Sequence, residues 1–336
     1  MKAMVLAAGL GTRMRPLTLL RAKPALPVLN RPLIQWTLDL LAHHGVTEVI
    51  INLHHLPKTM VRAVGDGRAF GLDVAWSREV RILGTGGGPR KVRDLLGDEP
   101  FFLVNGDVLF DFDLTDLLRR HRAAGARATL ALVPNPDPRR YSSIMTGAGG
   151  WVRSLARLPR PSRGQPSLFT GIHVLDPSLL DRLPEGPSDI VRDLYAPLIA
   201  EGEDILGVRV KGAWYDFGSP ALYLRSQLKM LSTGFRGLAR GPLVHPAARV
   251  HAHARVKRSI VGAGTVVGEG AEVVGSVLWD RVRVGAGARV RGSILATGSR
   301  VEPQEKVEGL MMLPVTGLRG MLPGRTRRGH RLVEVA

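Results

Sequence analysis

A glycine-rich turn near the start of the chain combines the residue types that bind phosphate. An apolar strand runs directly into Gly9-Leu10-Gly11-Thr12-Arg13. Glycines allow the backbone to approach a phosphate closely and to point its N–H groups at it. Thr12 adds a hydroxyl, and Arg13 adds a planar fork of donors that suits phosphate oxygens. The pattern predicts a phosphate-binding loop.

Two widespread phosphate loops do not fit this segment. The P-loop requires a Lys-Ser or Lys-Thr pair after its glycines, and the turn has none. The dinucleotide fingerprint requires a third glycine where Met14 stands, and an acid about 20 residues further on, where the chain reads Val28–Arg31. From glycine spacing alone, a plain strand-to-helix turn remains the alternative.

Carboxylates follow two other strand-like segments. Asp107 follows the apolar run Phe101–Asn105, and the end of such a strand is where parallel α/β sheets place ligand sites. Asp216 lies in the aromatic stretch Trp214–Pro220. An ordinary turn at Asp107 and a buried strand end at Asp216 are the alternatives.

These motifs, in this order, resemble the sugar-1-phosphate nucleotidylyltransferases, whose signature is Gly-x-Gly-Thr-Arg followed about ten residues later by Lys-Pro. The matching residues are Gly9, Gly11, Thr12, Arg13, Pro16, Lys23 and Pro24, with the runs Asn30–Ile34, Leu83–Gly87, Asn105–Asp107 and Trp214–Pro220. Hexad repeats follow the last motif, as in the branch that includes the mannose-1-phosphate guanylyltransferases.

The resemblance implies Mg²⁺-dependent transfer of a nucleotidyl group from a nucleoside triphosphate (NTP) to a sugar-1-phosphate, giving NDP-sugar and pyrophosphate. GTP with mannose-1-phosphate is the expected pair, and UTP or dTTP with a glucose or amino-sugar phosphate is the alternative. The catalytic residues would be Arg13, on the β- and γ-phosphates, and Lys23, on the α-phosphate. Asp107 and Asp216 would hold Mg²⁺. The attacking phosphate is already ionised at neutral pH, so no general base is required.

Further site residues follow from the same resemblance. The nucleotide-binding set is Leu6, Ala7, Ala8, Gly9, Gly11, Thr12, Arg13, Glu79, Gly84, Thr85 and Gly86. The sugar-phosphate set is Asn105, Tyr141, Arg157, Thr170 and Gly171. Glu79 is the expected acceptor for guanine. The sugar side departs from the family pattern, because Leu155–Pro161 lacks the usual Glu-Lys-Pro; Arg157 or Arg160 is the expected substitute.

The first 232 residues alternate apolar runs with helical periodicity, which predicts an α/β domain with a Rossmann-like, mostly parallel sheet and helices on both faces. The expected strands are 2–8, 47–53, 101–105, 127–133, 141–145, 151–156 and 168–175. The expected helices are 32–44, 59–64, 90–96, 114–124, 190–200 and 222–230.

After a linker at 233–242, an aliphatic residue recurs about every sixth position through residues 243–310, with small residues between. This rhythm predicts a short left-handed parallel β-helix, in which the aliphatic side chains fill the interior. Residues 311–336 are expected to be a basic tail or cap. His251 and His253 share a face of a repeat, and no third metal ligand is evident near them.

Composition sets the remaining expectations for this chain of 336 residues. It has no cysteine, which excludes disulfides, thiolate metal sites and a cysteine nucleophile. Its net charge is +18, but aromatic residues are only 5%, so nucleic-acid binding is not expected. No apolar run suggests a membrane span. We expect a cytoplasmic protein that forms a homo-oligomer. A non-catalytic scaffold and an acyltransferase acting through the β-helix are the other hypotheses.

Overall fold

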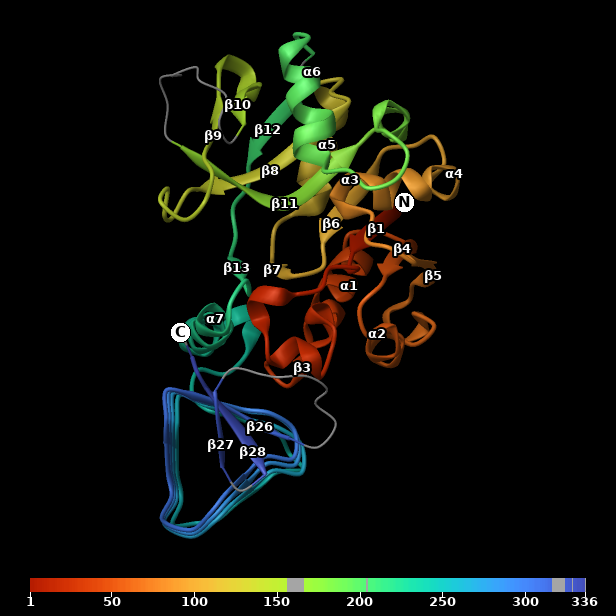
Figure 1. The fold of residues 1–336 in the computed structure, drawn as a ribbon. Coiled ribbons are helices and arrows are strands. Elements are labelled where there is room, and N and C mark those ends of the chain that lie inside the picture. The colour runs from red at the N-terminus through yellow and green to blue at the C-terminus, as the bar shows by residue number, and fades with distance from the viewer. Residues whose placement is uncertain (156–165, 204, 316–323, 328, 336) are drawn as a thin grey trace. The chain divides into compact units, whose positions relative to one another are not determined.

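The computed structural model describes residues 1–155, 166–203, 205–315, 324–327 and 329–335 (Figure 1). Contacts divide the chain into two compact units. Unit 1 consists of Met1–Leu10 and Leu33–Tyr215, and unit 2 of Gly11–Pro32 and Asp216–Ala336. The phosphate-loop segment from residue 11 onwards therefore packs with the unit that holds the C-terminal repeats.

Unit 1 is built on a mixed nine-stranded sheet. Its strands are β1 (Lys2–Leu6), β4 (Glu48–Leu53), β5 (Asp73–Arg78), β6 (Phe101–Asn105), β8 (Ala128–Pro134), β9 (Ile144–Thr146), β10 (Val152–Leu155), β11 (Ser167–Leu175) and β12 (Ile205–Arg209). β1 lies between β4 and β6 and is parallel to both, and β5 extends this parallel part beyond β4. β11 is antiparallel to β6 and to β8, and β12 is parallel to β8. Because β1, β4 and β6 run in the same direction, the loops that follow them lie at the same edge of the sheet.

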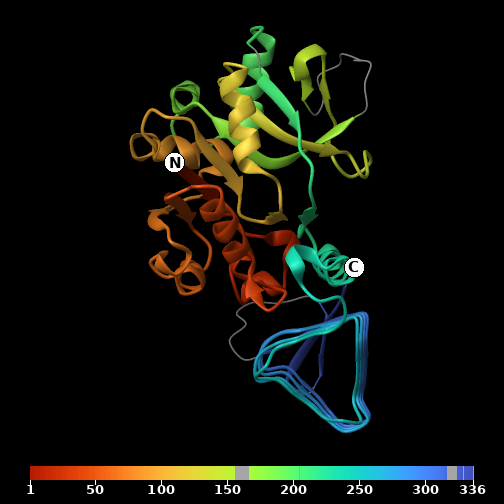
Figure 2. The ribbon, with the colours of Figure 1, turned by 180° about the vertical axis from the view of Figure 1, so that it is seen from behind.

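Helices pack against this sheet. They are α1 (Leu33–His43), α2 (Pro57–Val64), α3 (Gly84–Lys91), α4 (Arg93–Leu96), α5 (Leu114–Ala123) and α6 (Ala196–Ala200), the last preceded by a π-helical turn at Val191–Tyr195. α5 lies along β8, β11 and β12, as Figure 2 shows from behind. The middle residues of β1 and β6 are fully buried, as expected for central strands covered on both faces. The predicted α/β class is confirmed.

Two features of unit 1 differ from the sequence analysis. The helix expected at 90–96 begins earlier, because α3 starts inside the glycine run at Gly84. Backbone hydrogen bonds explain this start, since Ser188 N–H donates to Leu83 O and Gly86 N–H donates to Ser188 O, both at 2.9 Å. The strands β5 and β12 were not predicted. β5 lies at the sheet edge and alternates in exposure, so it lacks the apolar run of a central strand.

Unit 2 begins with what we call the lysine segment, residues 11–32. It contains three short 3₁₀ turns at Thr12–Met14, Leu17–Leu19 and Lys23–Ala25, followed by the strand pair β2 (Pro27–Val28) and β3 (Arg31–Pro32). The same unit contains α7 (Pro220–Thr233), whose N-terminus is capped by Ser219. β13 (Trp214–Asp216) precedes α7 and pairs with β7 (Val108–Phe110).

The repeats form a β-helix of triangular section (Figure 1). One side consists of β14 (Leu243–Val244), β17 (Ile260–Val261), β20 (Val277–Leu278), β23 (Ile294–Leu295) and β26 (Leu310–Pro314). The second side consists of β15 (Arg249–Val250), β18 (Val266–Val267), β21 (Arg283–Val284) and β24 (Arg300–Val301). The third consists of β16 (Arg255–Lys257), β19 (Glu272–Val274), β22 (Arg289–Arg291) and β25 (Lys306–Glu308). The predicted parallel β-helix is confirmed, with coils at 243–259, 260–276, 277–293 and 294–310.

Each coil has 17 residues rather than three full hexads, because one corner is a residue shorter. A column of buried serines bridges this corner: Ser276 N–H donates to Ser259 Oγ at 3.1 Å, and Ser293 N–H donates to Ser276 Oγ at 3.1 Å. The residues before these serines, including Gly275 and Gly292, have positive φ, which explains the glycines there. The serine hydroxyls thus satisfy backbone donors that the shortened corner buries.

The described part of the last stretch extends the β-helix. β28 (His330–Glu334) pairs antiparallel with β26, and β27 (Arg325–Arg327) pairs with β28. Arg327 Nη1 lies 3.0 Å from Glu305 Oε1 in the fourth coil. Across the described ranges, the structure contains no helix with the length and apolarity that crossing a bilayer requires.

Candidate active site

The backbone at the end of β1 is held by the neighbouring strand. Ala7 N–H donates to Asn52 Oδ1 at 2.6 Å, and Gly106 N–H donates to Leu6 O at 2.9 Å. Ala7 and Ala8 are buried, whereas Gly9 is exposed and a Cβ there would meet nothing within 4 Å. Hydrogen bonds therefore fix the backbone at the first predicted nucleotide-binding residues of unit 1, and the chain becomes exposed to solvent at Gly9.

Glu79 is part of the same network. Its Oε1 accepts from Asn52 Nδ2 at 2.7 Å, its Oε2 accepts from Leu83 N–H at 2.8 Å, and the residue is only 3% exposed. Both oxygens thus bind groups of the protein. The arrangement connects the end of β1 to the glycine turn through two side chains.

The glycine turn at residues 84–88 packs against residues 186–190. Thr85 Oγ1 donates to Asp189 Oδ2 at 3.0 Å and accepts from Ile190 N–H at 2.9 Å, so its hydroxyl is engaged inside the protein. A Cβ at Gly86 would lie 2.7 Å from Ser188 Oγ, and one at Gly84 would overlap Ser188 O. The close approach of the two backbones therefore requires glycine.

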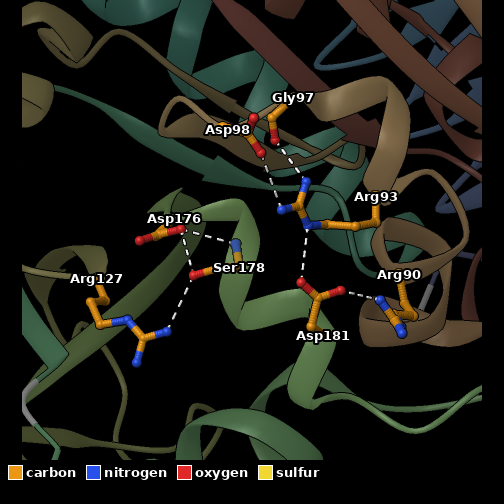
Figure 3. Close-up of polar contacts among 8 residues, drawn as sticks. All are labelled: Arg90, Arg93, Gly97, Asp98, Arg127, Asp176, Ser178 and Asp181. Atoms are coloured by element: carbon orange, nitrogen blue, oxygen red, sulfur yellow. Dashed lines mark hydrogen bonds and ion pairs between the residues drawn. The ribbon is translucent and has the colours of Figure 1, made fainter.

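Asp181 pairs with residues at the end of α3 and in α4. Its carboxylate pairs with Arg90, at the end of α3, and with Arg93 Nε at 3.4 Å (Figure 3). Arg93 also donates to Gly97 O at 2.8 Å. One carboxylate therefore links the end of α3 to α4.

The predicted sugar-phosphate residues Asn105 and Gly171 lie together. Gly171 sits at a register shift of β11 with φ 82°, and a Cβ there would lie 2.8 Å from Asn105 Cγ. Thr170 is 1% exposed, and its hydroxyl donates to Ala131 O at 2.8 Å. The threonine side chain therefore faces the sheet, while the bulge brings the backbone of β11 against Asn105.

An aromatic pair lies beside the predicted sugar-side residues. The ring of Tyr141 lies edge-on to that of Trp214, with centroids 5.8 Å apart, and Trp214 Nε1 donates to Thr170 O at 3.0 Å. Tyr141 is thereby linked to the bulge. Arg157 and Arg160 lie outside the described residues.

His173 is a buried base two residues beyond the bulge. Burial lowers its pKa to about 3 and holds the pKa of Tyr195 well above its usual value. The two side chains share a short hydrogen bond, and Phe169 packs edge-on to the imidazole at 4.5 Å. His173 is therefore neutral at pH 7 and acts as part of the core.

In unit 2, the predicted phosphate-binding loop closes on itself. Gly11 has φ 60°, its carbonyl accepts from Thr18 Oγ1 at 2.8 Å, and a Cβ there would lie 2.7 Å from Thr18 Cγ2. Thr12 and Arg13 are exposed on the first 3₁₀ turn. The fold therefore presents both phosphate-binding candidates to solvent.

Lys23 lies in the third 3₁₀ turn and is 7% exposed. Its backbone carbonyl accepts from Leu26 N–H at 3.1 Å, which closes this turn.

Asp216 is half-buried, and its carbonyl accepts from Ser226 Oγ of α7 at 3.0 Å. A Cβ at Gly218 would lie 2.9 Å from Asp216 Oδ1. In unit 1, Asp107 is also half-buried, in the turn after β6. The two candidate Mg²⁺ ligands are thus partly open carboxylates, the donor type that Mg²⁺ uses.

His251 and His253 of the first coil do have a third potential metal ligand close by. Glu269 of the second coil brings its carboxylate to 3.4 Å from His253 Nδ1, and potential ligand atoms of all three residues lie within 4.8 Å of one another. The interpretation that none is near was wrong, because the third group comes from the next coil. All three side chains are exposed.

Asn52 and Asp181 were missed by the sequence analysis. An asparagine inside the otherwise apolar run Val49–Leu53 was the available signal, since a polar residue in a central strand requires partners. Asp181 gave no signal, because it lies in a short turn far from its partners in sequence.

Comparisons with known proteins show the family of this chain. A family model described as "Nucleotidyl transferase" matches residues 2–233, and one described as "GlmU-like, C-terminal hexapeptide" matches residues 229–309. The chain is 34% identical over 290 residues to mannose-1-phosphate guanylyltransferase of Mycobacterium tuberculosis, which covers 84% of this chain and 80% of the relative.

Two further relatives are each 32% identical to this chain. A probable mannose-1-phosphate guanylyltransferase 2 of Oryza sativa subsp. japonica is 32% identical over 292 residues, 84% of this chain and 79% of its own. A UTP–glucose-1-phosphate uridylyltransferase of Synechocystis sp. is 32% identical over 247 residues, 69% of this chain and 64% of its own. The family predicted from the motifs is thereby confirmed: the chain belongs to the nucleotidyl transferase family and carries a hexapeptide-repeat C-terminal domain.

Proposed function

We propose that this protein transfers a guanylyl group from GTP to mannose-1-phosphate, giving GDP-mannose and pyrophosphate, with Mg²⁺ as cofactor. The observation that carries the proposal is the similarity to mannose-1-phosphate guanylyltransferases over 84% of the chain, together with the motif residues Arg13, Lys23, Asp107 and Asp216. The uridylyltransferase relative supports UTP with glucose-1-phosphate as the second candidate.

In the proposed reaction, a phosphate oxygen of the sugar-1-phosphate forms a bond to the α-phosphorus of GTP, and the bond to pyrophosphate breaks. Exposed Arg13 binds the β- and γ-phosphates, and Lys23 balances the charge that grows on the α-phosphate. Little covalent work falls to the protein, so positioning and charge stabilisation provide the rate enhancement.

Asp107 and Asp216 would hold Mg²⁺, which supplies charge neutralisation for the phosphates. The backbone of Leu6–Ala8 and the glycine turn bind the nucleoside, and Asn105 with the Gly171 bulge binds the sugar phosphate. The engaged carboxylate of Glu79 supports a second role for this residue, in which it fixes Leu83 and Asn52 while the base binds to the backbone it positions.

The test is pyrophosphate release with Mg²⁺, measured for GTP, UTP, dTTP, ATP and CTP with mannose-, glucose- and amino-sugar-1-phosphates. Lys23→Ala serves as the inactive comparison, and Lys58→Ala serves as a control on a lysine outside the motifs. Release with GTP and mannose-1-phosphate that Lys23→Ala abolishes supports the proposal. Release with UTP or dTTP instead favours the second candidate function. If the folded protein releases no pyrophosphate with any substrate pair, the result favours the non-catalytic scaffold.

A further inference from the structure

The lysine segment is attached to the β-helix and α7 at residues on both sides of Lys23. Arg21 precedes Lys23 by two residues, and Pro27, Leu29 and Asn30 follow it. Each of the four makes a polar contact with α7 or with a coil. The family motif and the repeats are therefore joined within one compact unit.

Arg21 reaches two successive coils. Its Nη2 donates to Thr297 Oγ1 at 3.2 Å, in the fourth coil, and lies 3.6 Å from Asp280 Oδ2, in the third. Its guanidinium also lies over the ring of Trp279, 5.4 Å from the centroid. Asp280 is itself held, because its Oδ1 accepts from Ala263 N–H of the second coil at 3.2 Å. A planar, forked side chain is required to make these contacts together.

On the C-terminal side of Lys23, the buried hydroxyl of Tyr223 connects Pro27 to Trp279 of the third coil. Tyr223 of α7 donates from its OH to Pro27 O, and the OH accepts from Trp279 Nε1 at 3.0 Å. Burial raises the pKa of Tyr223, so the phenol stays protonated and can donate. Trp279 is 2% exposed, and its one polar atom is used in this contact.

The turn between β2 and β3 is fixed in the same way. Leu29 and Asn30 both have positive φ, at 51° and 65°. Leu29 N–H donates to the buried Gln227 Oε1 of α7 at 2.9 Å, and Asn30 Nδ2 donates to Val261 O of the second coil at 3.0 Å. These bonds hold a conformation that is costly for residues other than glycine.

From these contacts we infer that coils two to four of the β-helix, together with α7, fix Lys23 in position for nucleotidyl transfer. Arg21, Tyr223 and Trp279 are positioning residues for that step. α7 also binds the Asp216 backbone through Ser226, so one helix supports both motifs. The catalytic part of this inference rests on the proposed function. In this inference the β-helix contributes to catalysis, because it holds Lys23 in position.

The experiment compares Arg21→Ala and Trp279→Phe with Arg291→Ala in the full-length protein. Arg291 is a matched control, because it pairs with Glu272 at 2.7 Å between the third and second coils of the same β-helix. We expect Arg21→Ala to lower kcat about 10- to 100-fold, as misplacement of a catalytic group does, with KM for the triphosphate changed less than about threefold. Trp279→Phe keeps a six-membered aromatic ring but removes the pyrrole part of the indole with its N–H, so a fall in kcat smaller than that of Arg21→Ala is expected.

Amide hydrogen exchange of residues 22–30 provides a readout that does not depend on activity. Exchange in Arg21→Ala should be faster in these residues and unchanged in Arg291→Ala. Equal kcat in Arg21→Ala and Arg291→Ala, or unchanged exchange in residues 22–30, would overturn the inference. If wild type released no pyrophosphate with any substrate pair, the proposed function would fail, while the exchange comparison would still decide whether the β-helix holds the segment.

Discussion

The side-chain amide of Asn52 joins two parts of the proposed nucleotide-binding region: its nitrogen donates to Glu79 Oε1 at 2.7 Å, while its oxygen accepts from the backbone N–H of Ala7 at 2.6 Å. Through Glu79 the chain of bonds continues to Leu83, directly before the glycine turn. Buried networks of this kind are costly to break, because each lost partner leaves a polar group unsatisfied.

Glu79→Gln should therefore destabilise the protein by about 1–3 kcal/mol, since the new NH₂ group faces a donor at either Asn52 or Leu83. If Glu79 positions the turn, kcat/KM falls by similar factors for GTP and UTP. Urea unfolding and steady-state kinetics measure both effects, with Glu99→Gln as the exposed control. A loss confined to GTP would show instead that the carboxylate binds guanine directly.

Gly171→Ala tests the bulge beside Asn105. The left-handed conformation costs a non-glycine residue about 1–2 kcal/mol, and here the new methyl also overlaps the asparagine amide. Gly202→Ala is the matched control, because Gly202 has φ 84° with nothing within 4 Å of its Cβ. We expect Gly171→Ala to be the less stable variant and to raise KM for the sugar phosphate. Equal unfolding free energies and equal KM values would contradict this.

Ser276→Ala tests the serine column of the β-helix. The change leaves Ser293 N–H without its acceptor in a buried corner, so a loss of about 1–3 kcal/mol in unfolding free energy is expected. Ser232→Ala, at the exposed end of α7, should change stability by less than about 0.5 kcal/mol. Thermal and denaturant unfolding provide the comparison, and a difference below the control would rule out this role for the hydroxyl.

His173 should make the protein sensitive to acid. Its folded pKa of about 3 lies below the ordinary value of 6.5, so the unfolded chain binds more protons between these values. The contribution is fully present above pH 6.5 and is lost as the pH falls toward 3. Between pH 7 and pH 4.5, wild type should lose about 2–3 kcal/mol more than His173→Gln. Urea unfolding at the two pH values measures this difference, and parallel losses would show that the imidazole is not the cause.

The sequence alone determined the family, the fold class and most of the motif residues. Phe101–Asn105 and the helix at residues 33–43 are recognisable because their patterns are local: an apolar run gives a buried strand, and a 3.6-residue period gives a helix. Hexad spacing likewise predicted the β-helix, because each coil repeats the same short-range requirement for an aliphatic residue and small corners.

Only the tertiary structure decided how these parts are connected. Nothing local indicates that Arg21 binds Asp280 and Thr297, since about 260 to 280 residues separate the partners in sequence. The same holds for the third group beside His251 and for the engaged carboxylate of Glu79. Such contacts depend on which surfaces the folded chain brings together, and the free energy of each polar group depends on the partners it finds there.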